Sequence, residues 1–197
     1  MPSARFPTPI GECTLTWSDA GLTGFALPSA PRFPATSARS VARERNDPSS
    51  SVLRPPSFAL RSVARERNDP PTAHQPPSTA SLIARVQRHL AGDLQDFADL
   101  TYDWSRVTEF QSRVLRAVLA VKPGRTATYG DLARAIGAKP GTARAIGGAV
   151  GANPWPLLVP CHRILGAGGR LTGYSAPGGL ATKRALLALE GAELATG

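Results

Sequence analysis

The side chains best suited to covalent chemistry in this sequence are Cys161 and its neighbours His162 and Arg163. A thiol becomes a useful nucleophile when a nearby base or positive charge favours the thiolate, and an acid such as Glu190 is available to assist. Three prolines in the preceding segment, 153–160, restrict its backbone and would hold the sulfur in a set position. The pattern predicts a nucleophilic cysteine. Spacing alone leaves open a buried cysteine that only fills space.

Two short helices separated by a break are expected just before this segment, at 128–136 and 142–150, with the spacing of a helix-turn-helix. The second reads TARAIGGAV, in which Arg144 is the one large polar side chain. Glycine inside a helix costs up to about 1 kcal/mol relative to alanine. Gly147 and Gly148 therefore indicate either tight helix packing or close approach of a narrow surface such as a DNA groove.

Composition favours an anionic partner and a reducing compartment. The 197 residues include 23 Lys and Arg against 14 Asp and Glu, a formal charge of +9, and residues 121–197 hold nine of the basic and three of the acidic side chains. Two cysteines, Cys13 and Cys161, exclude a disulfide scaffold and are too few for structural zinc on their own. No apolar stretch resembles a signal peptide or a membrane span of roughly 20 residues, so we expect a cytoplasmic protein.

The chain changes character along its length. Residues 9–27 alternate like a β-hairpin, whereas about 31–80 is rich in Pro, Arg and Ser and predicts disorder. Within that stretch the decapeptide RSVARERNDP occurs at 39–48 and again at 61–70. Two copies with few apolar residues cannot stack into a solenoid, so we interpret the stretch as a duplicated insertion in a surface loop without a function of its own.

Ordered patterns resume after the insertion. A helix is expected from Ser81 to a stop at Gly92, a strand over 95–104, an amphipathic helix capped by Thr108 and ending near 122, and a last helix over about 180–190. The Thr108-capped helix has an apolar stripe that predicts a core position.

The segment Pro160-Cys161-His162-Arg163 is preceded by Asn153-Pro154 and followed by Gly173-Tyr174-Ser175 and a Leu-Leu-x-x-Glu helix. In this order the motifs resemble the O6-alkylguanine-DNA alkyltransferases, also called methylated-DNA–protein-cysteine methyltransferases. The resemblance covers about 81–195 and the hairpin at 9–27. It implies an α+β fold: residues 1–104 as a small β-hairpin or sheet with a helix, a ribonuclease H-like remnant, and residues 105–197 as an α-helical domain with a winged-helix-like helix-turn-helix.

The resemblance also implies roles at the site. Cys161 matches the alkyl acceptor, His162 the base that takes the thiol proton through a water, and Glu190 the acid that orients His162. Asn153 matches the residue that braces the turn beneath the site. Tyr129 matches the tyrosine that crowds the target phosphate and helps to protonate the departing guanine.

The implied partner is double-stranded DNA that carries O6-alkylguanine, bound through its minor groove with the damaged base flipped out, because a thiol cannot reach a base inside the stack. Arg144 matches the finger that fills the vacated place. The other implied contacts are Thr142, Ala145, Gly147 and Gly148 for DNA, and Tyr174, Ser175, Pro160 and Ile164 for the base pocket. Transfer would be stoichiometric and irreversible, extend to O4-alkylthymine, and need no cofactor and no metal in a monomeric protein.

The chain departs from the family pattern in three places. Some members of the family bind zinc in the N-terminal domain, whereas Cys13, His74 and His89 supply too few ligands here. The insertion interrupts the N-terminal domain, and Ala176-Pro177 adds two residues to the loop over the base. Three other functions compete with alkyl transfer: a lesion-binding relative without transfer, which would lack the acceptor cysteine, a helix-turn-helix regulator, and a cysteine hydrolase.

Overall fold

The structure, a computed structural model, describes residues 1–33, 78–139 and 141–192. Both copies of the decapeptide and most of the predicted insertion at 31–80 lie outside these residues. Within the described ranges, no helix combines the length and the apolar character needed to cross a membrane.

The N-terminal part of the chain forms a three-stranded antiparallel sheet in the order β1 (Ser3–Thr8), β2 (Gly11–Ser18), β3 (Gly21–Ala26). The predicted hairpin is confirmed as β2 and β3. Strand β1 was not predicted because prolines surround it, and Pro7 lies within it. Proline is tolerated on an edge strand, which is where β1 lies.

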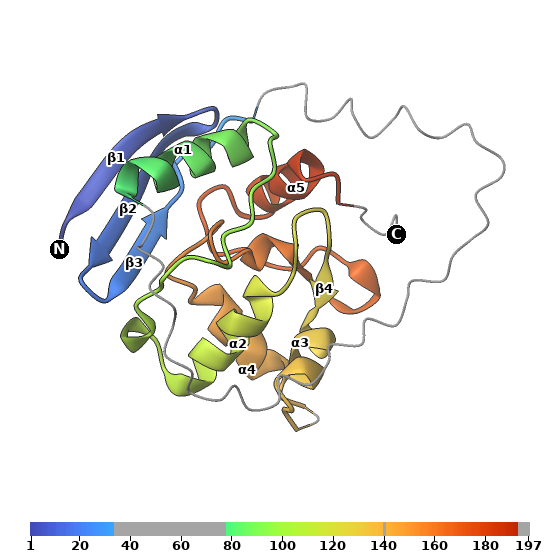
Figure 1. The fold of residues 1–197 in the computed structure, drawn as a ribbon. Helices are drawn as coiled ribbons and strands as arrows, with labels where there is room; N and C mark the ends of the chain where they lie inside the picture. Colours follow the sequence, from blue (N-terminus) through green and yellow to red (C-terminus); the bar gives the residue numbers. More distant parts are fainter. Residues whose placement is uncertain (34–77, 140, 193–197) are drawn as a thin grey trace, which may run out of the picture.

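Helix α1 (Thr79–Leu90) packs along this sheet (Figure 1). Its buried side chains recur at helical spacing and are Leu82, Val86, His89 and Leu90. The helix begins earlier than predicted, because the hydroxyl of Ser78 accepts the backbone N–H of Ser81. It ends just before Gly92, whose φ of +96° favours glycine.

The strand predicted over 95–104 is wrong, because these residues form turns, one isolated bridge between Tyr102 and Leu22, and the start of the 3₁₀ helix η3 (Trp104–Arg106). Asp96 accepts the backbone N–H of Ala98, and the carbonyl of Phe97 accepts the hydroxyl of Tyr102. Asp side chains that bond their own backbone favour turns over strands.

The C-terminal part is helical, with the helices predicted there confirmed within about three residues of their expected bounds (Figure 1). They are α2 (Glu109–Leu119), α3 (Tyr129–Ala135), α4 (Ala143–Gly151) and α5 (Gly179–Leu189). Thr108 caps α2, and Thr128 and Asp131 form a capping box on α3. Two short parallel strands, β4 (Ala127–Thr128) and β5 (Ile164–Leu165), tie the start of α3 to the residues after the 3₁₀ helix η4 (Cys161–Arg163). A further 3₁₀ turn, η5 (Ala167–Gly169), follows β5.

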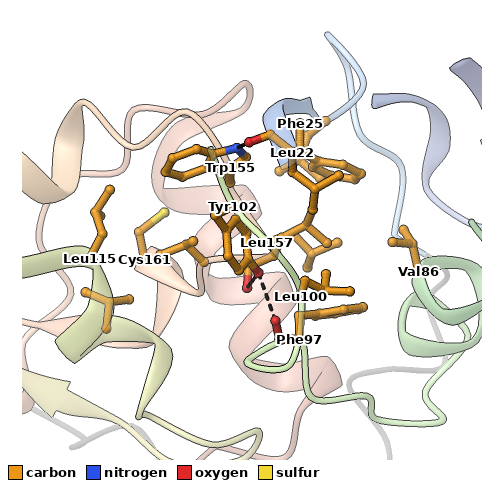
Figure 2. Packing of buried hydrophobic residues seen from close by; sticks show 14 of the residues in the cluster. Leu22, Phe25, Val86, Phe97, Leu100, Tyr102, Leu115, Trp155, Leu157 and Cys161 are labelled. Atoms are coloured by element: carbon orange, nitrogen blue, oxygen red, sulfur yellow. Dashed lines mark hydrogen bonds between the residues drawn. The ribbon is translucent and has the colours of Figure 1, made fainter. Parts of the chain in front are cut away.

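One continuous hydrophobic core joins the sheet and α1 to these helices. Figure 2 shows Trp155, from the loop after α4, donating its indole N–H to the carbonyl of Leu22 on β3, at 2.9 Å. The rings of Tyr102, Trp104 and Trp155 contact one another, with centroids 5.3 to 5.5 Å apart. Cys161 belongs to the same core as Leu115 and Leu157 (Figure 2).

We expect Trp155→Phe to lower the free energy of unfolding by about 2 kcal/mol, because it removes a buried hydrogen bond and leaves space where the indole packs. Urea unfolding followed by circular dichroism measures this. The matched control is Trp104→Phe, which changes a half-buried ring of the same cluster and should cost under about 1 kcal/mol. A larger loss for Trp104→Phe would contradict the bridging role of Trp155.

Candidate active site

The loop between α4 and η4 sets the position of Cys161. The side-chain amide of Asn153 donates to the carbonyl of Val159 at 2.9 Å, and its oxygen accepts the backbone N–H of Trp155 at 3.0 Å. Leu157 in this loop is buried with a φ of +78°, a strained conformation for a residue with a side chain. The two bonds of Asn153 thus close a strained turn directly beneath the cysteine.

Cys161 is buried, with 4% of the residue exposed. Burial raises its pKa, and this effect outweighs the opposing influence of the Asn153 side chain and of the positive charge on Lys183. The resting sulfur is therefore protonated and requires a base before it can act as a nucleophile.

His162 is fully buried, with Nε2 3.0 Å from Oε1 of Glu190. A carboxylate only accepts, so Nε2 carries the proton and Nδ1 is left as an acceptor. Nδ1 has no hydrogen-bond partner among the described residues. Burial lowers the pKa of His162, although the nearby Glu190 acts to raise it. The low pKa keeps the ring uncharged. The geometry is that of a neutral imidazole able to take a proton on Nδ1.

Glu190 lies at the C-terminal end of α5 and is 4% exposed. Arg163 donates two hydrogen bonds to its carboxylate, from Nε to Oε2 at 2.8 Å and from Nη2 to Oε1 at 2.7 Å. Burial alone would raise the pKa of Glu190, but its contacts with His162, His89 and Arg163 prevail and hold the pKa well below its usual range. The carboxylate is therefore ionised and fixed.

Two buried titratable residues near the site were not predicted. Lys183 donates from Nζ to the carbonyls of Ile164 and Thr172, at 2.5 and 3.1 Å, and burial lowers its pKa to about 8. His89 places Nε2 3.2 Å from Oε1 of Glu190. Both could have been found from helical spacing, since His89 follows the buried Val86 by three residues and Lys183 precedes the buried Leu186 and Leu187 by three and four.

A pocket of about 340 Å³ opens beside the sulfur. Its lining consists of Tyr129, Gly147, Val150, Gly151, Cys161, Gly173, Tyr174 and Ser175. The hydroxyl of Tyr174 is buried without a hydrogen-bond partner among the described residues, and burial, reinforced by the neighbouring Cys161, raises its pKa. Of the four residues expected to form the base pocket, Tyr174 and Ser175 line it, whereas Pro160 and Ile164 are buried and do not.

Helix α4 runs along the rim of this pocket and presents small residues. Arg144, Ala145 and Gly148 are exposed, and Gly147 is half-buried. A methyl group added at Gly148 would meet nothing within 4 Å, and one at Gly147 would meet only the ring of Tyr129 at 4.0 Å. Packing within the protein therefore does not require either glycine. Thr142 at the start of α4 is half-buried, and its hydroxyl donates to the carbonyl of Lys139.

Within the described ranges, no three His, Cys, Asp or Glu side chains are grouped so that they could hold a metal ion. The catalytic residues implied by the resemblance are nonetheless brought together: Cys161, His162 and Glu190 form one buried cluster, Asn153 closes the turn below it, and Tyr129 lines the pocket.

Comparisons of sequence and fold relate the chain to known proteins. Residues 109–192 match the family profile described as 6-O-methylguanine DNA methyltransferase, DNA binding domain. The methylated-DNA–protein-cysteine methyltransferase of Mycobacterium tuberculosis strain H37Rv is 47% identical over 115 residues, which is 58% of this chain and 67% of that protein. The corresponding protein of Methanosarcina acetivorans is 43% identical over 107 residues, 54% of this chain and 65% of its own length.

A crystal structure of the Mycobacterium tuberculosis OGT in complex with DNA superposes with a TM-score of 0.62 at 33% identity, covering 95% of this chain and 92% of that one. The α+β arrangement of a small antiparallel sheet and helices is thus shared with solved structures. Given the extent and identity of these matches, the chain belongs to the methylated-DNA–protein-cysteine methyltransferase family.

Proposed function

We propose that this protein repairs DNA directly, by moving the alkyl group of O6-alkylguanine onto Cys161 in a single, irreversible turnover. The observation that carries the proposal is the buried thiol of Cys161 at a pocket, next to a neutral His162. The Nε2 of His162 is bound to Glu190, which leaves Nδ1 to accept a proton. Its relatives of 43 to 48% identity bear the name methylated-DNA–protein-cysteine methyltransferase, which supports the same reaction.

A water between the two side chains passes the thiol proton of Cys161 to Nδ1 of His162. The sulfur attacks the alkyl carbon in line, so that a C–S bond forms while the bond from carbon to O6 breaks and its electron pair goes to the guanine. Tyr129, which lines the pocket, helps to protonate the departing guanine, so that overall the guanine gains the proton that the thiol loses. The product is a stable thioether, which consumes the protein.

Helix α4 is the proposed DNA contact. Its exposed small residues suit a narrow groove, and the exposed Arg144 would fill the gap left by a flipped nucleotide. Thr142, Ala145, Gly147 and Gly148 complete this contact, and Tyr174 and Ser175 cover the flipped base. The structure of a relative with bound DNA supports DNA as the partner.

The proposal extends to the organisation, substrate range and setting of the protein. It includes the division into 1–104 and 105–197, a ribonuclease H-like origin for the first part, a winged-helix-like second part, activity on O4-alkylthymine, a monomeric state and a cytoplasmic location. A lesion binder without transfer is disfavoured by the acceptor Cys161, and a simple regulator would not need the buried relay.

The direct test is incubation with a duplex that carries O6-methylguanine, followed by mass analysis of the peptides. We expect one methyl group on the Cys161 peptide, absent in Cys161→Ala. Cys13→Ala is the matched control and should keep transfer, because Cys13 is buried in the sheet and burial raises its pKa to about 11. Tight binding of the lesion with Cys161 left unmodified would favour the lesion-binding function instead.

Arg144→Ala should slow transfer from duplex DNA about tenfold or more, because the flipped state then bears an unfilled gap in the stack that costs a few kcal/mol. Transfer from a single-stranded oligonucleotide, which has no partner strand to restack, should change less. Single-turnover rates on both substrates measure the difference. The control is Arg184→Ala, which removes one exposed charge on α5, away from the pocket, and should slow transfer from both substrates weakly and to the same extent. If Arg144→Ala also slowed transfer from both substrates to the same extent, a gap-filling role would be refuted.

A further inference from the structure

His89, at the C-terminal end of α1, is fully buried against the active-site carboxylate although it belongs to the N-terminal part of the chain. Its Nδ1 accepts the backbone N–H of Gln95 at 3.1 Å, and its ring contacts that of Phe97. A nitrogen that accepts a hydrogen bond carries no proton, so the proton of the ring is on Nε2. Nε2 lies 3.2 Å from Oε1 of Glu190.

Oε1 of Glu190 is therefore approached by three donors. Nη2 of Arg163 at 2.7 Å and Nε2 of His162 at 3.0 Å form its regular hydrogen bonds. The N–H of His89 is the third donor, and its approach to Oε1 does not meet the geometry of a regular hydrogen bond. Within the described residues this N–H has no other partner. Burying an N–H group that is imperfectly paired costs free energy. A phenylalanine ring would fill the same space without that cost, so packing alone does not explain a histidine here.

We propose that His89 is a positioning residue of the relay: from the N-terminal part of the chain, its N–H holds Oε1 of Glu190 and limits how strongly the carboxylate favours a charged His162. This inference rests on the proposed function, because it concerns the residue that receives the thiol proton. It assigns the N-terminal part a direct role in the chemistry.

The consequence for pH follows from charge. Burial lowers the pKa of His162 most, and the electrostatic effect of the neighbouring His89 lowers it further. A donor on Oε1 acts in the same direction, because it withdraws negative charge from the carboxylate that favours a charged His162. His162 must be uncharged to accept a proton, so transfer slows as pH falls through the pKa of His162. Loss of His89 should therefore move this slowing to higher pH.

The charged and titratable groups around His162 come from four elements of the fold. They are His89 from α1, Cys161 and Arg163 from η4, Tyr174 from the following loop, and Lys183 and Glu190 from α5.

The experiment compares wild type, His89→Phe and His89→Gln across pH 5.5 to 9 with the full chain. Two rates are followed on the Cys161 peptide: methyl transfer from the O6-methylguanine duplex, and alkylation by iodoacetamide, which needs no DNA. In His89→Phe the midpoint of the acid limb should rise by about half a pH unit or more, a roughly threefold loss of rate below the midpoint. In His89→Gln, whose amide N–H reaches the same place, it should stay within about 0.2 unit of wild type.

Val86→Ala, one turn earlier on the same buried face of α1, is the matched control for loosened packing and should leave the midpoint unchanged. Coincident profiles for wild type and His89→Phe, or an equal shift in Val86→Ala or His89→Gln, would overturn the proposal. If His89→Phe does not fold, ¹⁵N spectra of the wild-type imidazoles decide: a proton on Nε2 of His89 supports the proposal, and one on Nδ1 overturns it. Failure of methyl transfer in wild type would refute the proposed function, while the iodoacetamide profiles would still judge His89.

Discussion

The buried negative charge of Glu190 is the constraint around which the site is built. A lone carboxylate in the interior would be protonated or would destabilise the fold, and loss of a partner from a buried ion pair typically costs about 3–5 kcal/mol. Arg163 neutralises this charge, while His162 and His89 bring N–H groups to one of its oxygens. Meeting this requirement fixes η4 against the end of α5 and both against the end of α1. The same contacts give His162 the tautomer that leaves Nδ1 ready to receive a proton.

The rigidity needed at the sulfur comes from beyond the helix-turn-helix. The turn before Cys161 contains the strained Leu157 and persists because Asn153 ties it internally and Trp155 ties it to β3. A strained backbone is kept only where the surrounding structure over-determines it. The sheet and α1 are thus part of what holds the reactive group, even though the pocket itself is lined by C-terminal residues.

The sequence predicted best where the signal was local. The helices followed from apolar spacing and from caps such as Thr108 and Thr128, and the hairpin followed from alternation. Strand β1 was not found, because its prolines count against a strand unless its edge position is known, and the expected strand at 95–104 failed because Asp side chains turned the chain. The Cys161, His162 and Glu190 cluster was predicted through resemblance. The contact of His89 with Glu190 joins residues 101 positions apart, and no local pattern specifies which buried polar residues of distant helices will meet.

The buried ammonium of Lys183 has a consequence for the whole molecule. Its pKa of about 8 in the folded protein lies below the 10.5 of a solvated lysine, so folding loses free energy from this group while it is charged. As pH rises from about 8 toward 10.5 that loss diminishes, and this group makes the fold more stable. Over the same interval the site loses the positive charge that favours a thiolate at Cys161. Arginines on the exposed faces stay charged throughout. Alkalinity therefore strengthens the fold at this residue while it removes one of the charges that favour a thiolate at Cys161.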